Sequence, residues 1–208
     1  MISAFLTGIA LSFSLILAIG AQNVFVLRQG LLRQHVFAVA LFCSISDAVL
    51  IGLGVTGVSW LLGDLIKMYS LWVFAAAAIW LVIYGLLHLR SAFKMTSLDI
   101  ENLKEEKSLL LVLLTAALVT FGNPHVYLDT LILIGTISIR FSPEERLPFA
   151  IGAALASFTF FFSLAYGAKL LAPKFKNAKT WQALDITIAI VMFLLAFGML
   201  GAGGWLTF

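Results

Sequence analysis

Charged residues are scarce in this chain. They make up 11% of its 208 residues, whereas a soluble globular domain has about 25%. So few charges cannot shield the hydrophobic residues, 62% of the chain, from water, and the mean hydropathy is +1.08. The composition excludes an ordinary soluble domain and predicts an integral membrane protein whose surroundings are the lipid bilayer.

The chain also has very little cysteine, and it lacks a phosphate-binding loop and a basic N-terminal segment. Cys43 is the single cysteine, which excludes an intrachain disulfide and a cysteine-based metal cluster. No glycine-rich phosphate loop is present, so we expect no nucleotide hydrolysis, no cofactor and no resident metal ion. No Lys or Arg precedes Arg28, so the first apolar run lacks the basic start of a signal peptide and is expected to remain as a membrane span.

Six apolar runs are long enough to cross a bilayer, which requires about 20 residues each. None shows the alternation of a membrane barrel strand, so all six are expected to be helices. The runs cover residues 1–27, 36–63, 68–87, 108–139, 147–168 and 186–208. The sequence therefore predicts an all-α integral membrane protein with six transmembrane helices in a single domain, residues 1–208.

Basic residues between these runs predict the orientation of the helices. Ten of the 13 Lys and Arg residues follow the first, third and fifth runs, and the net charge of +3 is therefore a property of loops rather than of a nucleic acid surface. Positive loops stay in the cytoplasm, so we expect the linker 91–107 there and both termini outside. The ten are Arg28, Arg33, Arg90, Lys94, Lys104, Lys107, Lys169, Lys174, Lys176 and Lys179.

The polar linker 91–107 divides the chain into halves of three spans, residues 1–90 and 108–208. Because three is odd, the halves have to run through the membrane in opposite directions. GAQNVFVL at 20–27 and GNPHVYLD at 122–129 are similar in sequence and lie in the first span of each half. This pattern predicts two inverted three-helix repeats with interrupted first and fourth helices, an arrangement typical of transporters.

The fourth run contains a polar cluster at a predicted break. At 1.5 Å per residue, residues 108–139 would extend about 48 Å, against about 30 Å of hydrocarbon. Asn123 is a good helix cap and Pro124 suits a first helical position, so the two residues can end one half-helix and begin another. The new N-terminus would offer free N–H groups to a carboxylate, and His125 and Asp129 would share the next helical face.

Structural readings of this cluster stay open beside the functional one. Pro124 can be a simple kink, and His125 can serve only to hydrogen-bond Asp129. A carboxylate at membrane depth costs about 2.5–3.5 kcal/mol and typically marks a substrate pathway or proton relay. Asp129, and Asp47 in the second run, are therefore the stronger functional candidates.

The chain resembles the LysE-type basic amino acid exporters, most closely their arginine-exporter branch. The resemblance covers nearly the whole chain and rests on IGAQNVFVLRQG at 19–30, CSISDAVLIGLGVTG at 43–57 and NPHVYLDTLILIG at 123–135. Members usually have proline where this chain has Ala21, but the preceding glycine and the two following amides are kept. The resemblance implies a multi-pass carrier of the bacterial inner membrane that exports L-arginine or L-lysine from the cytoplasm on an ion gradient.

A basic amino acid needs one site for its carboxylate and others for its two cations. A half-helix N-terminus suits the carboxylate, whereas Asp47 and Asp129 suit the cations. The same aspartates could exchange the cation for protons, which would make the carrier a proton-coupled antiporter; a homodimer is an open alternative to a monomer. The predicted substrate-binding residues are Gln22, Asn23, Asp47, Asn123, Pro124, His125, Tyr127 and Asp129.

Two other functions are weaker alternatives. An intramembrane aspartyl protease would use Asp47 and Asp129 as its dyad, but the Gly-x-Gly-Asp pattern that such proteases resemble is absent. Export of another small cation or a metal ion would use His125 and Asp129, whose spacing suits a ligand pair, but the chain has only three histidines.

Overall fold

Every element in the described part of the structure, a computed structural model, is helical. The structure describes residues 1–17, 20–94, 108–123, 126–171, 173, 175, 177–202 and 205, without the side chains at 58–70, 73, 77, 94 and 202. The elements are α1 (Ile2–Ile16), α2 (Ala21–Leu32), α3 (Val36–Leu53), η1 (Gly54–Val58), α4 (Ser59–Lys94), α6 (Leu109–Phe121), η2 (Tyr127–Leu133), α8 (Ile134–Ser138), α9 (Pro143–Leu171) and α10 (Ala178–Ala202).

Four of these helices are long and apolar enough to cross a membrane, and a bent pair of helices raises the number to five. The four segments are Val36–Gly57, Phe74–Phe93, Pro143–Leu171 and Ala178–Gly201. These are fewer spans than the six predicted, because the first and fourth apolar runs, whose helices were expected to be interrupted, each form two shorter helices within the described residues.

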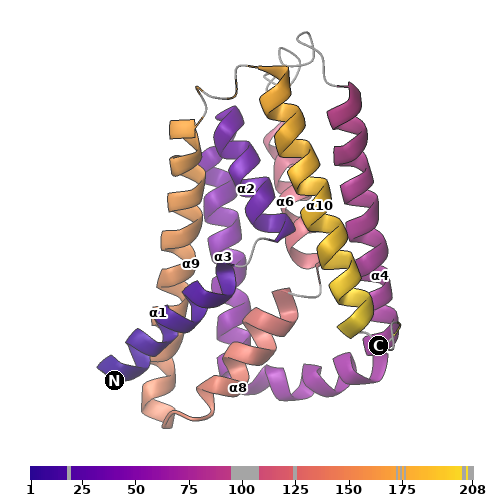
Figure 1. Cartoon of the computed structure of the whole chain (residues 1–208). Coiled ribbons are helices and arrows are strands. Elements are labelled where there is room, and N and C mark those ends of the chain that lie inside the picture. Colours follow the sequence, from indigo (N-terminus) through magenta and orange to yellow (C-terminus); the bar gives the residue numbers. More distant parts are fainter. Residues whose placement is uncertain are drawn as a thin grey trace.

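The first run breaks between α1 and α2, whose axes differ by 82°. Gly20 precedes α2 in an extended conformation, with φ −116° and ψ 174°, so the direction of the chain changes without a proline at position 21. The expected interruption of the first helix is present, and it places the end of α1 and the start of α2 near mid-height of the molecule (Figure 1).

The fourth run breaks where its polar cluster lies. α6 ends at Phe121, and Asn123 is not helical; Pro124 and His125 lie outside the described residues. Val126 N–H then donates to the Asn123 carbonyl at 3.2 Å, and the chain continues through the wide turns of η2 into α8. The excess length of this run over the bilayer thickness is thus taken up by two short helices.

Two other boundaries differ from the predicted runs. Gly57 has φ +97°, a value that L residues rarely adopt, and the regular helix of the second run ends at Leu53 rather than near residue 63. α10 begins at Ala178, eight residues before the predicted span 186–208. It includes Asp185, which hydropathy counts as unfavourable but which is fully buried and hydrogen-bonded in the fold.

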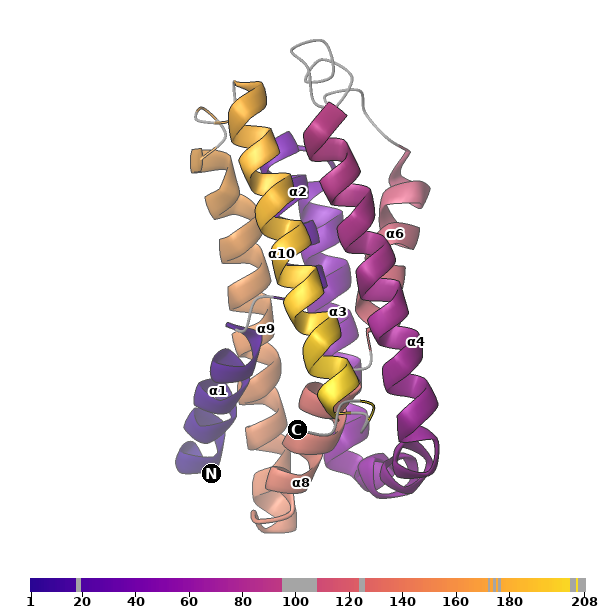
Figure 2. The ribbon, with the colours of Figure 1, turned by 45° about the vertical axis from the view of Figure 1, so that its right-hand side comes forward.

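The helices form an upright bundle with the N-terminus and the last turn of α10 toward the same end (Figures 1 and 2). The last turns of α2, α4 and α9 and the first turns of α6 and α10 lie at the opposite end, which we call the linker end. α9 packs against α1, α2 and α3, while α10 packs along α4. The predicted grouping of the connections after the first, third and fifth runs at one end is therefore present in the described helices.

Glycines bring α1 and α9 into close contact. A Cβ atom at Gly8 would overlap the Phe149 carbonyl oxygen and lie 3.0 Å from the Ala153 nitrogen, and a Cβ atom at Gly152 would overlap the Phe5 carbonyl oxygen. These neighbours are backbone atoms that cannot turn aside as a flexible side chain could. The crossing therefore requires glycine on both helices.

We expect Gly8→Ala and Gly152→Ala each to lower the free energy of unfolding by about 1–3 kcal/mol, the usual effect of overpacking a buried contact. Thermal unfolding of the purified protein in detergent measures the loss. Gly167→Ala is the matched control on α9, because a Cβ atom there meets nothing within 4 Å and alanine favours a helix more than glycine does. Equal unfolding midpoints for Gly8→Ala and Gly167→Ala would contradict the close crossing.

Candidate functional site

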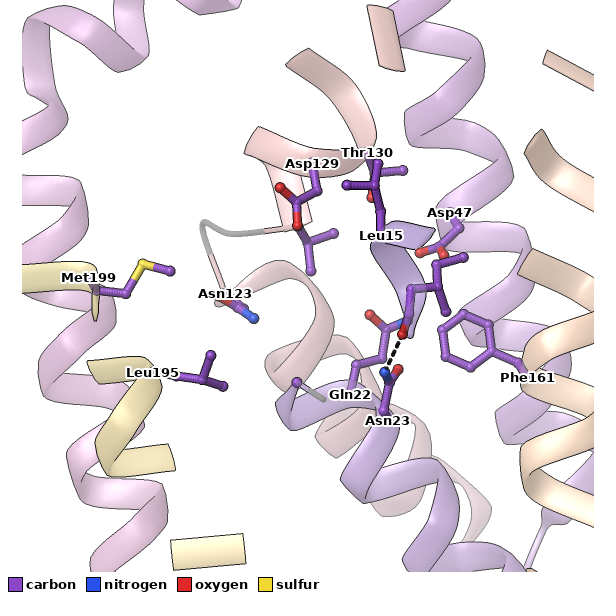
Figure 3. A pocket seen from close by; sticks show the side chains of 13 residues that line it. Leu15, Gln22, Asn23, Asp47, Asn123, Asp129, Thr130, Phe161, Leu195 and Met199 are labelled. Atoms are coloured by element: carbon purple, nitrogen blue, oxygen red, sulfur yellow. Dashed lines mark hydrogen bonds between the residues drawn. The ribbon is translucent and has the colours of Figure 1, made fainter. Parts of the chain in front are cut away.

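A cavity lies between the two helix breaks and brings together residues from both halves of the chain (Figure 3). Its wall includes the end of α1, the start of α2, the middle of α3, the break after α6 and the start of η2. Phe161 from α9 and Leu195 and Met199 from α10 complete it with apolar surface. The polar groups on the wall are Gly20, Gln22, Asn23, Asp47, Asn123, Asp129 and Thr130.

Five of the eight residues proposed from the sequence therefore share one cavity, although they lie up to about one hundred positions apart in the chain. Tyr127 does not line it; its hydroxyl donates across the break to the Phe121 carbonyl at 3.0 Å. Pro124 and His125 lie outside the described residues.

Asp47 forms the buried acidic wall of the cavity. Asp47 is only 3% exposed. The hydroxyl of Ser157 on α9 donates a hydrogen bond to Asp47 Oδ2 at 2.7 Å. The sequence does not single out Ser157, because Thr159 and Ser163 are similar hydroxyl residues in the same apolar run. Only the packing of α3 on α9 identifies which hydroxyl meets the carboxylate.

Asp129 approaches the same cavity from the η2 side, so the two carboxylates face it from different elements (Figure 3). No Lys or Arg side chain is among the described residues that line this cavity. Two carboxylates without a lysine or arginine on the wall form a site suited to a ligand that supplies positive charge itself.

The start of α2 offers hydrogen-bond donors on another wall. Gly20, the N-cap, has no side chain with which to cap the helix, and the first intrahelical acceptor is its carbonyl, which receives Val24 N–H at 3.1 Å. The amide groups in the first turn of a helix have no intrahelical acceptor, and they carry the positive end of the helix dipole. This wall is suited to an anionic group.

Two amide side chains belong to the same wall. Gln22 is 6% exposed, and its Nε2 has no hydrogen-bond partner among the described residues. Asn23 Nδ2 donates to the Ile16 carbonyl at 2.8 Å, which connects α2 to the end of α1 across the break (Figure 3). Asn23 thus supports the bent geometry, and Gln22 offers a donor to the cavity.

A second charged cluster lies nearer the linker end and was not predicted from the sequence. His88 Nδ1 and Ser91 Oγ each lie 2.8 Å from an oxygen of Asp185, and Arg28 Nη1 lies 3.4 Å from Oδ1. The cluster connects α2, α4 and α10. Asp185 is the residue that could have indicated this cluster from the sequence. A carboxylate so close to an apolar run needs a polar or charged partner within the protein.

A family model and individual relatives both identify this chain with one family of membrane transporters. The family model described as LysE type translocator matches residues 13–203. The arginine exporter protein ArgO of Salmonella enteritidis PT4 is 38% identical over 98% of this chain and 96% of its own length. The arginine exporter protein ArgO of Salmonella typhi is 37% identical over the same shares. No solved structure matches the chain.

Proposed function

Because this chain belongs to the family of LysE type translocators, we propose that it is a secondary active exporter of L-arginine, with L-lysine as a second substrate, coupled to the proton gradient. The chain is an amino acid exporter of the inner membrane, with several apolar spans, and not an enzyme. Asp47 and Asp129 are therefore not a protease dyad.

The observation that carries the proposal is the pairing of two carboxylates with a helix N-terminus around one cavity. Arginine has an α-carboxylate, an α-ammonium and a side-chain guanidinium. The start of α2 and the Gln22 amide suit the first group, and Asp47 and Asp129 suit the two cations. A neutral amino acid would leave one intramembrane carboxylate without a substrate cation, which is unfavourable in a membrane.

The α-carboxylate is assigned to α2 because the start of that helix lines the cavity beside the Gln22 amide. The sequence also predicts an N-terminus after Asn123, with Pro124 and His125 beside it. In an inverted repeat the two helix starts would be equivalent, and the carboxylate would occupy one of them in each direction of transport.

Proton coupling follows from the same carboxylates. A site that binds a dication with two intramembrane aspartates has to neutralise them again after the substrate leaves, because charged carboxylates at membrane depth are costly. Protons entering from outside can do so, and their release toward the cytoplasm would restore the acidic site. The exchange of substrate for protons makes export thermodynamically downhill.

We further propose that the linker end faces the cytoplasm and that the halves 1–90 and 108–208 form an inverted repeat. The orientation is supported by the basic residues near that end. The repeat is supported by the two broken segments at the cavity and by the packing of α3 on α9 and of α4 on α10, elements that would be symmetry partners.

Inverted membrane vesicles test the substrate and its coupling. We expect them to accumulate labelled arginine, lysine to compete, and a protonophore to stop the accumulation. Agmatine, which is arginine without its carboxylate, should compete at least tenfold less well, since it cannot occupy the helix start. Faster uptake of threonine than of arginine would exclude a basic substrate, and equal competition by agmatine would exclude the carboxylate assignment.

Asp47→Asn and Asp129→Asn test the acidic wall. Both substitutions nearly keep the shape and lower the cost of membrane burial, so the variants should reach the membrane in normal amounts. Each should lose net arginine export at least a hundredfold, because one substrate cation loses its charged partner. Counterflow of labelled against unlabelled arginine, which needs no gradient, shows whether either aspartate serves proton coupling alone. Full net export in one variant would make that aspartate a structural group.

Gly20 allows a matched test of the helix start. A Cβ atom at Gly20 meets nothing within 4 Å, and its φ of −116° suits any residue, so Gly20→Ala should transport arginine nearly as the parent does. Gly20→Asp places a carboxylate where it can cap α2 itself and compete with the substrate. We expect Gly20→Asp to raise the half-saturating arginine concentration about tenfold or more. If Gly20→Asp and Gly20→Ala transport alike, α2 does not bind the carboxylate.

A further inference from the structure

A second cavity, of about 430 Å³, lies near the linker end between α2, α4 and α6. It shares no lining residue with the cavity between the helix breaks. Gln22 lines the first cavity and Gln29 the second, so the two positions on α2 are seven residues, or about 10 Å, apart along the helix axis. The polar groups that matter here are Arg28, Gln29, Tyr84, His88 and Ser91.

Asp185 of α10 is held by two side chains of α4 that line this cavity. It is fully buried, with Ser91 Oγ donating to Oδ2 and His88 Nδ1 lying 2.8 Å from Oδ1. Nδ1 is also 3.3 Å from Arg28 Nη1, but the shorter distance and the carboxylate charge favour a ring N–H that donates to Asp185. An N–H in that position cannot also accept from Arg28.

Arg28 is consequently the weakly held member of the cluster. Its closest acceptor is Asp185 Oδ1 at 3.4 Å, a long contact for a charged pair. A guanidinium has five N–H donors, and among the described residues only Nη1 of Arg28 has a partner. The side chain is 18% exposed and lines the cavity, so it can bind an anion there while Asp185 keeps its two partners.

Gln29 supplies a second indication of a ligand. The residue is 5% exposed and lines the same cavity, and its Oε1 has no hydrogen-bond partner among the described residues. A buried acceptor without a donor is costly, by about 1–3 kcal/mol. A ligand with an N–H donor would satisfy it.

We propose that this cavity is a loading site for the α-amino acid group, used before the substrate reaches the cavity between the breaks. The proposal rests on the proposed function and adds a second, side-specific site to it. Arg28 binds the α-carboxylate, and Gln29 Oε1 accepts a hydrogen bond from the α-ammonium. Neighbouring side chains at positions 28 and 29 thus recognise the two groups that every α-amino acid shares, and selection among side chains is left to Asp47 and Asp129.

A phospholipid headgroup with a phosphate and an ammonium group has related chemistry. The cavity rim includes Leu87 and Leu111, which are 59% and 52% exposed and could contact an acyl chain. The amino acid is favoured because polar side chains make up the larger part of the lining besides Arg28. They are Gln29, Gln34, Tyr84, His88, Ser91 and Thr115, against Phe25, Leu32, Leu87, Leu111 and Val112. The experiment below distinguishes binding of a lipid headgroup in this cavity from binding of an amino acid.

The experiment compares two buried glutamines of α2. Gln29→Leu and Gln22→Leu each remove one amide, and arginine exchange is measured with substrate offered to inverted vesicles and to right-side-out vesicles. We expect Gln29→Leu to raise the half-saturating concentration about tenfold only from the linker side. Gln22→Leu should raise it from both sides, because its cavity serves both directions. Thr187→Val, an exposed hydroxyl on α10 that bonds within its own helix, should change neither value.

Arginine binding in nanodiscs of phosphatidylcholine alone completes the test. The parent should bind at two sites and Gln29→Leu at one. If Gln29→Leu does not reach the membrane, Arg28→Lys tests the same site, since it keeps the charge but loses the planar fork.

Equal effects of Gln29→Leu from both sides, or none from either, would overturn the loading site and leave the proposed function intact. A parent that binds one arginine in phosphatidylcholine, with a Gln29→Leu effect seen only when phosphatidylethanolamine is added, would assign the cavity to lipid and overturn the loading site as well. A parent that moves no basic amino acid from either side would instead overturn the proposed function, and the loading site with it.

Discussion

Polar groups inside a bilayer have no water to bind, and the arrangement of this protein depends on that constraint. Breaking a helix in hydrocarbon frees amide and carbonyl groups that have to be satisfied within the protein. Here the two breaks lie against each other, so their free groups surround one cavity instead of meeting lipid. Asp47 and Asp129 line the same cavity, and a polar ligand can therefore replace water as the partner of all these groups.

The sequence predicted those features that depend on local chemistry. The bilayer thickness and the Asn123–Pro124 pair predicted a break in the fourth run, and α6 does end at Phe121. The cost of an intramembrane carboxylate identified Asp47 and Asp129, which share the cavity. These arguments need no knowledge of which helices are neighbours.

Features that depend on the rotation and height of one helix against another could not be predicted. Ser157 meets Asp47 because α3 and α9 pack in one particular register, and the sequence offers no reason to prefer it to Thr159. The start of α10 at Ala178, before the predicted span, likewise depends on how this helix packs against α4. Asp185 lowers the hydropathy of that stretch, yet it is buried because Ser91 and His88 approach from α4.

The glycine contacts of α9 have a mechanical consequence. Gly8 brings α1 against the first half of α9, and Gly30 brings α2 against its second half, where a Cβ atom would lie 2.6 Å from the Ala168 Cβ and overlap the Ala165 carbonyl oxygen. Both arms of the bent segment are thus fixed to one continuous rod, and the 82° angle cannot straighten without separating backbone from backbone. At Gly85 of α4, by contrast, an added Cβ atom would meet the Phe193 ring and the Met192 Cβ of α10, and a side-chain ring can turn aside more easily than backbone can. The bent segment formed by α1 and α2 is therefore a fixed part of the wall around the cavity.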